Sequence, residues 1–355
     1  MKSKTKKPSI LVQVIVAVIL AGIVGISFLG YDLYKKAFKA NVIFGDGIQE
    51  RYIFIDSDDD FSDVLEILTD YDLLLDVNSF KWVAEKKNYI KNVKPGKYFI
   101  NRDINNNDLV NLLRSGRQSP VKVTFNNVRS LEAVSSKLST YLEADSSEIY
   151  QAFIDADFLS DSKFNISNVI SIFIPNTYEF YWNTSAVQLR KRILKEYNSF
   201  WNKERIKKAS IMNLTLTEVS TLASIVEKEQ NIKKDERPAI AGLYLNRLNK
   251  NMKLESDPTL IFALKDFNIN RVLNKDKKVD SPYNTYKYKG LPPGPICIPS
   301  INAIDAVLNA QEHDYIFMCA KEDFSGYHNF AKTYAKHLKN ARKYQRMLNK
   351  RRILR

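Results

Sequence analysis

The stretch Leu222-Ala-Ser-Ile-Val-Glu-Lys-Glu-Gln230 decides how the rest of this chain is understood. A helix turns by about 100° per residue, so four of its residues are predicted to share one face: Leu222, Ile225, Val226 and Glu229. This apolar stripe ends in a carboxylate, which the protein core would shield from water. Shielding raises the pKa of a carboxyl group, and a raised pKa suits a general acid at neutral pH. A structural alternative is that Glu229 ends the stripe and pairs with a nearby Arg or Lys.

Composition narrows the class of protein. The chain has 355 residues, enough for two or three domains, and its 45% hydrophobic and 26% charged residues are typical of a globular protein. The net charge of +14 fits nucleic acid, an anionic polymer or a membrane surface as partner. Cys297 and Cys319 form no C-x-x-C motif, and the three histidines lack metal-ligand spacing, so neither a disulfide framework nor a zinc cluster is predicted. Cys319 lies in an apolar run and is predicted to be a buried thiol.

The N-terminus predicts a membrane anchor. An uncharged run extends from Pro8 to Tyr31, and its apolar part, residues 10–29, has the roughly 20 residues that cross a bilayer core. Four lysines precede it: Lys2, Lys4, Lys6 and Lys7. We therefore predict a cytoplasmic tail (1–8), a transmembrane helix (9–31) in the cell (inner) membrane, and an extracytoplasmic remainder. The alternative is a cleaved signal peptide, but the run is long and Ile26-Ser-Phe-Leu-Gly30 is a poor cleavage site.

This topology changes the interpretation of the positive charge. Nucleic acid is scarce outside the membrane, and the sequence shows no helix-turn-helix or RNA-binding motif, so no nucleic-acid partner is predicted. An anionic cell-wall polymer or a lipid headgroup is the better match for the basic outer part.

Residues 32–44 are predicted to form a stalk and residues 45–125 a small α+β module. Its strands are expected at 52–56, near 93–100 and at 121–125, and its helices at 61–68, 77–87 and 105–117. Pro95-Gly-Lys-Tyr98, followed by Asn106-Asn-Asp-Leu-Val-Asn-Leu-Leu-Arg-Ser-Gly116, resembles a LysM module. LysM modules bind N-acetylglucosamine polymers. A plain spacer next to the membrane is the alternative.

The remainder is predicted to be a larger α+β domain over 126–350, with a helical linker (126–165) and a catalytic core (166–350). One long basic helix is expected over 187–206. The aromatic residues around Tyr178 suit either sugar stacking or an ordinary hydrophobic core.

Four motifs follow one another in the second half of the chain. They are Leu222–Glu229; Ile240–Leu248 with Met252–Thr259; Ser281–Tyr286 with Gly290–Ile296; and Gly326-Tyr-His-Asn-Phe330. In this order, behind a single anchor, they closely resemble the YceG-like (MltG-type) family of endolytic murein transglycosylases. The similarity covers roughly residues 175–348, and more weakly the module and the anchor.

The resemblance implies a lytic cut between N-acetylmuramic acid and N-acetylglucosamine in the glycan strands of peptidoglycan. The product carries a 1,6-anhydromuramic end and no water is consumed. One carboxyl group suffices, because it acts first as an acid and then as a base, whereas a hydrolase usually needs two. The resemblance implies neither a metal nor an organic cofactor, and it places peptidoglycan, the membrane and peptidoglycan synthases among the partners.

Alignment of the motif implies that Glu229 is the catalytic residue and that Glu227 shapes the groove or pairs with a basic residue. Asp257, just before Pro258, is predicted to hold the sugar amide or orient a neighbour; the alternative is a helix N-cap. A further set supplies an amide, a hydroxyl and two rings for sugar recognition: Tyr283, Asn284, Thr285 and Tyr286. The alternative for this set is a simple turn, and Tyr178 is predicted to line the opposite side of the groove.

Two other functions stay open at this point. The first is a non-enzymatic glycan-binding scaffold of the wall-synthesis machinery, which would share the anchor and the module. The second is a hydrolase that uses water and leaves reducing ends.

Overall fold

The computed structural model describes residues 9–45, 50–269 and 272–351. The protein is a mixed α+β fold, as predicted, and it divides into two compact units. Unit 1 comprises the chain up to residue 121 together with 181–183, and unit 2 comprises 122–180 and 184–355. The division lies close to the predicted boundary at residue 125.

The predicted N-terminal helix is present as α1 (Ile10–Phe38), and it is long and apolar enough to cross a membrane. Its apolar side chains are exposed, as expected of a surface that faces lipid. The tail with its four lysines lies outside the described residues. The helix does not stop at residue 31, because an ion pair between Asp32 and Lys36 (2.7 Å) bridges its next turn. The segment predicted as a stalk is thus helical to Phe38, and its end, with Val42 and Phe44 buried, belongs to the core of unit 1.

Unit 1 follows the predicted order of elements up to residue 117, but placing the strand 121–125 in this module is wrong, because that strand pairs with residues 176–180 and lies mostly in unit 2. Two antiparallel strands, β1 (Glu50–Ile55) and β2 (Gly96–Asn101), pack with three helices: α2 (Phe61–Asp70), α3 (Val77–Lys86) and α4 (Asn106–Ser115). Tyr98 and Ile100 alternate with more exposed residues along β2, and Gly116 ends α4 in the left-handed conformation (φ 68°). These strands and helices confirm the secondary structure predicted for residues 50–117, whereas the likeness to LysM modules stays a prediction.

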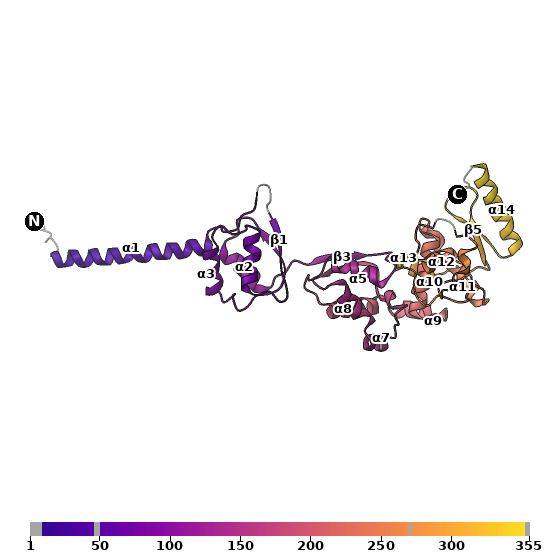
Figure 1. Cartoon of the computed structure of the whole chain (residues 1–355), viewed down its shortest axis with the longest axis horizontal. Helices are drawn as coiled ribbons and strands as arrows, with labels where there is room; N and C mark the ends of the chain where they lie inside the picture. The colour runs from indigo at the N-terminus through magenta and orange to yellow at the C-terminus, as the bar shows by residue number, and fades with distance from the viewer. Residues whose placement is uncertain (1–8, 46–49, 270–271, 352–355) are drawn as a thin grey trace, which may run out of the picture. The chain divides into compact units, whose positions relative to one another are not determined.

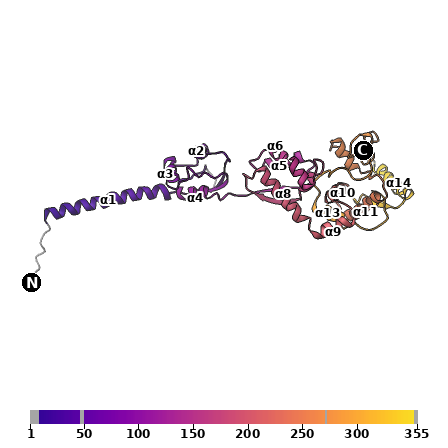
Figure 2. The same ribbon diagram turned by 90° about the horizontal axis from the view of Figure 1, so that it is seen from below.

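Buried amides fasten the end of α1 to unit 1. The Asn106 side chain donates hydrogen bonds to the carbonyl of Lys36 (2.9 Å) and to Ser79 Oγ (2.8 Å). It also accepts one from Asn41 Nδ2 (2.8 Å). The end of α1 packs against α3 and α4 (Figures 1 and 2). The membrane helix and the module are therefore joined without a flexible stalk.

The first part of unit 2 is a small sheet packed with helices. Strands β3 (Val121–Phe125) and β4 (Asn176–Phe180) pair. Around them lie α5 (Leu131–Ser139), α6 (Ser146–Ile154), α7 (Ala156–Ser162), the 3₁₀ helix η1 (Val169–Ile172) and α8 (Ala186–Phe200). Phe125, Phe153 and Phe173 pack ring against ring in the core.

The prediction of one helix over 187–206 is wrong. Helix α8 ends at Phe200, and α9 (Lys203–Ile211) begins after two intervening residues. Buried Trp201 stands between them, and the side chain of Asn202 accepts a hydrogen bond from Arg205 N (3.0 Å) as the N-cap of α9. The helical periodicity continues through Asn202, so the pattern alone gave no sign that a new helix begins there.

Residues 222–229 of the stretch quoted first form the C-terminal half of α10 (Leu216–Glu229). This helix lies at the centre of the second part of unit 2. Every residue from Val219 to Val226 is buried. Three further helices pack around α10 (Figures 1 and 2): α11 (Arg237–Asn249), α12 (Asp257–Leu264) and α13 (Ile301–Leu308). Two 3₁₀ turns lie between these helices: η2 (Lys234–Glu236) before α11 and η3 (Asp276–Lys278) before α13. The described chain closes with the hairpin of β5 (Phe317–Ala320) and β6 (His328–Ala331), followed by α14 (Tyr334–Lys350).

Asn106→Ala tests the attachment of α1. It removes two donated hydrogen bonds and one accepted bond, and leaves buried partners unsatisfied, which costs about 1–3 kcal/mol. We expect a loss of this size in the free energy of unfolding of unit 1, measured by urea titration with hydrogen exchange of α4. Asn107→Ala, one residue further and not fully buried, is the matched control. An equal loss of unfolding free energy in both variants would show that the buried amide of Asn106 does not hold α1 to unit 1.

Candidate active site

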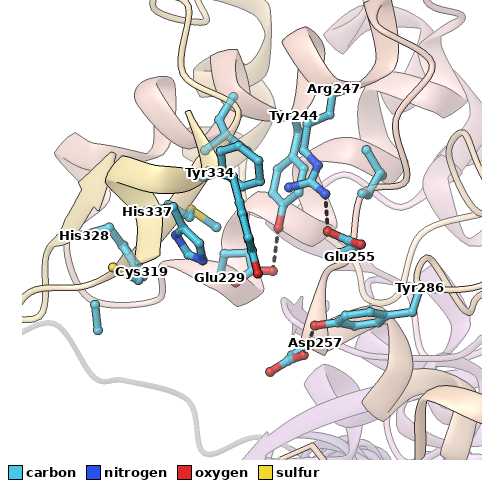
Figure 3. A pocket seen from close by; sticks show the side chains of 15 residues that line it. Glu229, Tyr244, Arg247, Glu255, Asp257, Tyr286, Cys319, His328, Tyr334 and His337 are labelled. Atoms are coloured by element: carbon cyan, nitrogen blue, oxygen red, sulfur yellow. Dashed lines mark hydrogen bonds and ion pairs between the residues drawn. The ribbon is translucent and has the colours of Figure 1, made fainter. Parts of the chain in front are cut away.

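A pocket of about 370 Å³ opens in unit 2 where α10 ends (Figure 3). It is bounded by α11, the start of α12, the β5–β6 hairpin and α14. The polar side chains that line it include Glu229, Tyr244, Arg247, Glu255, Asp257, Tyr286, Cys319, His328, Tyr334 and His337.

Glu229 is the last residue of α10 and stands half-buried at this pocket. The phenol of Tyr244 donates a hydrogen bond to Oε1 (2.7 Å), and the hydroxyl of Ser256 donates a second bond to the same atom (2.5 Å). Both hydrogen bonds given to this carboxyl by described residues end on Oε1. The carboxyl is therefore held by one oxygen, and Oε2 is the oxygen that can carry a proton to a bound molecule.

Burial raises the pKa of Glu229 above its ordinary value. The hydrogen bonds from Ser256 and Tyr244 act in the opposite direction, while the negative charge of Asp257 raises the pKa further. The position at the C-terminal end of a helix also disfavours a negative charge. The net direction is upward, so the structure favours the protonated acid.

Ser256 holds Glu229 instead of capping a helix. It occupies the N-cap position of α12, but its side chain makes no capping hydrogen bond. Its backbone N–H donates to Thr285 Oγ1 (3.0 Å), and its carbonyl accepts from Thr259 Oγ1 (2.8 Å). These bonds fix the backbone of Ser256 and so aim its hydroxyl at Glu229.

The predicted recognition set divides into two groups. Tyr286 lines the pocket and donates its phenol to Asp257 Oδ1 (2.5 Å), which lines it too. Thr285 and Asn284 are buried behind the pocket; the amide of Asn284 donates to the carbonyls of Lys277 (3.0 Å) and Val279 (2.7 Å). Asn284 and Thr285 thus order the loop that presents Tyr286.

Tyr283, Tyr178 and Glu227 are placed outside the pocket. Tyr283 packs against the ring of Phe262, with centroids 4.7 Å apart. Tyr178 stacks on Phe125, donates its phenol to the carbonyl of Ile174 (2.6 Å), and has its pKa raised by burial to about 12.

Glu227 points away from the pocket into an ion pair. Its Oε1 lies 3.6 Å from the guanidinium of buried Arg237, and its Oε2 accepts a hydrogen bond from Ser300 N (2.6 Å). The structure therefore separates the two glutamates of the motif: Glu227 ties α10 to Arg237 and to the start of α13, and only Glu229 faces the pocket.

Sequence reasoning missed the residues that hold the pocket in shape. Tyr244 and Ser256 lie inside the quoted motifs, but nothing in their local spacing points to Glu229. Arg247 donates to the carbonyls of Lys253 (2.8 Å) and Ile316 (3.0 Å) and forms an ion pair with Glu255, so it ties the hairpin to α11.

His328 and Cys319 also line the pocket. His328 lines it, and the carboxylate of Glu236 fixes the ring through Nδ1 (2.7 Å). Cys319 is half-buried at the pocket wall, so the prediction of a buried thiol is wrong. Burial still raises the pKa of Cys319, which keeps it a thiol.

The Gly290–Ile296 segment of the third motif borders a different hollow. Residues Gly290–Pro293 line a depression of about 540 Å³ together with residues near the start of α10, and they do not line the Glu229 pocket.

Comparison with known proteins identifies relatives. The model of the YceG-like family matches residues 53–343. A protein of Bacillus subtilis named endolytic murein transglycosylase is 28% identical over 310 residues, which are 82% of this chain and 84% of that protein. A Streptococcus pneumoniae protein of the same name is 28% identical over 275 residues, which are 68% of this chain and 49% of that protein. The solved structure of a yceG-like protein from Listeria monocytogenes matches with a TM-score of 0.53 and 26% identity, over 82% of this chain and 98% of that one.

Glu229→Gln is expected to stabilise the protein at alkaline pH. The folded state binds the proton of Glu229 more tightly than the unfolded state does, so the stability linked to this proton is complete below pH 4.5 and declines as the pH rises towards the folded pKa. Gln stays neutral and keeps an oxygen for Tyr244 and Ser256. We expect a Tm a few degrees above wild type at pH 8 and a smaller difference at pH 4.5, since about 1 kcal/mol is worth roughly 2–4 °C in a domain of this size.

The measurement is thermal unfolding at both pH values, with Glu312→Gln, an exposed loop residue, as control. A difference between Glu229→Gln and wild type that is the same at both pH values would contradict a raised pKa.

Proposed function

The chain belongs to the YceG-like family, and we propose that it shares the activity of its named relatives. It is a membrane-anchored murein transglycosylase that cleaves the glycan strands of peptidoglycan. The single observation that supports this chemistry best is the half-buried Glu229 at the wall of a polar pocket, where its carboxyl is held at Oε1 and its pKa is raised by burial.

The proposed reaction begins with the protonated carboxyl. Glu229 gives its proton to the oxygen that links N-acetylmuramic acid to N-acetylglucosamine, and the bond from C1 of the muramic sugar to that oxygen breaks. The leaving sugar departs with the proton. The burial that raises the pKa of Glu229 makes this donation effective at neutral pH.

The second step uses the same carboxyl as a base. The C6 hydroxyl of the muramic sugar attacks C1, and its proton passes to Glu229. A 1,6-anhydro ring forms, the acid is restored and no water is consumed. Ser256 and Tyr244 serve this step, because their donated hydrogen bonds stabilise the carboxylate that exists between the two proton transfers.

Asp257 and Tyr286 are the proposed sugar-contacting residues. They lie beside Glu229 and are linked through the Tyr286 phenol. A carboxylate that accepts from one phenol keeps a second oxygen for an amide N–H or a hydroxyl of the sugar. The ring of Tyr286 supplies an apolar face of the kind on which sugars stack.

The predicted membrane anchor indicates where this activity takes place. With α1 in the cell membrane and the N-terminus inside, the pocket would face the wall, where synthases extend new strands. An internal cut there ends the elongation of a strand. The rigid attachment of α1 to unit 1 supports an enzyme that works at the membrane rather than deep in the wall.

Glu229→Gln is expected to reduce the release of soluble glycan fragments by at least about a thousandfold, because the amide can neither donate the proton nor take one back. The measurement is fragment release from purified peptidoglycan by the full chain in detergent, with Glu312→Gln as the control that keeps its activity. Unchanged release by Glu229→Gln would refute the assignment. If wild type binds glycan without releasing fragments, the scaffold function is the correct one.

Two further variants are expected to move the pH–rate profile in opposite directions. Asp257→Asn removes a negative charge that raises the pKa of Glu229, so the alkaline limb should move to lower pH. Tyr244→Phe removes a hydrogen bond that lowers this pKa, so the limb should move to higher pH, with activity reduced about tenfold.

Both profiles are measured as kcat/KM against pH on variants whose Tm shows that they fold. Shifts in the same direction would mean that Glu229 does not set the alkaline limb.

A further inference from the structure

A second polar pocket lies in unit 1, at the end of the membrane helix. It has a volume of about 260 Å³ and is formed where the last turn of α1 meets the first turns of α3 and α4. Three of its residues are lysines at the end of α1: Lys35 and Lys36 in the last turn, and Lys39 as the C-cap. The chemistry of the proposed transglycosylase makes no use of this pocket.

The pocket has an excess of positive charge. Two carboxylates also line it, but both are engaged: Asp32 pairs with Lys36 (2.7 Å), and Asp76 accepts from Ser79 N (3.1 Å) as the N-cap of α3. Lys35 and Lys39 form no ion pair with any described residue and are exposed. The ammonium groups of Lys35 and Lys39 are therefore available to bind an anion.

The position along α1 indicates which kind of anion. If the apolar run fills the bilayer core to residue 29, Lys35 lies about 9 Å further on, at 1.5 Å per residue. Side chains on a helix lean towards its N-terminus, which here is the membrane side, and lysines extend readily to headgroup level. The charged end of Lys35 therefore reaches the layer of lipid phosphates, and Lys39 lies just beyond the end of the helix, further from the bilayer.

Orientation alone does not explain these lysines. Basic residues that orient a membrane helix gather on its cytoplasmic side. Three lysines on the outer side act against this orientation, so they have another reason to be there. Cations in a last turn do complement the helix dipole, but that effect requires no pocket.

The walls of the pocket are rigid and partly apolar. Asn41, Ser79 and Asn106 are buried at its floor, and their side chains hydrogen-bond to one another and to backbone carbonyls. Leu75 lines the same pocket with 61% of its surface exposed, and its N–H is fixed to the carbonyl of Asn41 (2.9 Å). An exposed leucine beside lysines suits a lipid better than a soluble phosphate.

We infer that this pocket binds the phosphate of a membrane lipid headgroup through Lys35 and Lys39, with Leu75 against the start of the lipid chain. The inference rests on the anchor in the proposed function. A bound headgroup would add a second point of attachment and hold unit 1 close against the bilayer.

The test uses the full chain and measures lipid binding by native mass spectrometry from detergent. The probes are phosphatidylglycerol, phosphatidylcholine and a short polyprenyl pyrophosphate. Lys35→Gln/Lys39→Gln removes the proposed site, and Lys81→Gln/Lys86→Gln removes the same charge from exposed positions on α3 outside the pocket. Resistance of the membrane-bound chain to alkaline extraction tests the anchor separately.

We expect the pocket variant to bind phosphatidylglycerol about tenfold more weakly than wild type and the α3 variant to match wild type. Lysine-dependent binding of the polyprenyl pyrophosphate alone would also support a lipid-phosphate site and would identify a lipid carrier as its ligand. Equal binding by both variants, with the chain still resistant to extraction, overturns the inference and leaves the proposed function intact. Extraction of wild type at alkaline pH overturns the anchor and the inference together.

Discussion

The structure of the site depends on one constraint on the carboxyl group of Glu229. It must be buried enough for its pKa to be raised, and hydrogen-bonded enough for its carboxylate form to be stabilised. Buried α10 delivers Glu229 to the pocket at its last turn, and burial there raises its pKa. Tyr244 and Ser256 supply the support by donating to a single oxygen. Two opposed influences on one group explain how a lone glutamate can serve as acid and as base.

Other parts of unit 2 position these three residues. Arg237 ties α11 to the carbonyl of Gln230 just beyond Glu229, which fixes the end of α10 (2.9 Å). Thr285 fixes the backbone of Ser256, and Asn284 orders the loop in which Thr285 lies. The four motifs thus contribute two kinds of residue: a few that face the pocket and a larger number that hold those few in place.

The distinction between residues that face the pocket and residues that hold them in place also limits what could be predicted from the sequence. Helical spacing placed Glu229 at the end of a buried stripe, because the face of a helix is a local property that sequence reveals directly. Tyr244 and Ser256 reach Glu229 only through the packing of α11 and α12 on α10, which no local pattern encodes. Within residues 283–286 only Tyr286 faces the pocket, since turn geometry sends Asn284 and Thr285 inwards. The N-cap at Asn202 and the Asp32–Lys36 ion pair that continues α1 to Phe38 are local features instead, and the helical and apolar patterns around them outweighed them in the prediction.

The central claim is that one carboxyl completes the reaction without water, and digestion in water labelled with oxygen-18 tests it most directly. Mass spectrometry of the fragments should show anhydromuramic ends that contain no label. Reducing ends that carry one labelled oxygen would contradict the account, because water would then be the nucleophile and a second carboxylate, such as Asp257, would have to activate it.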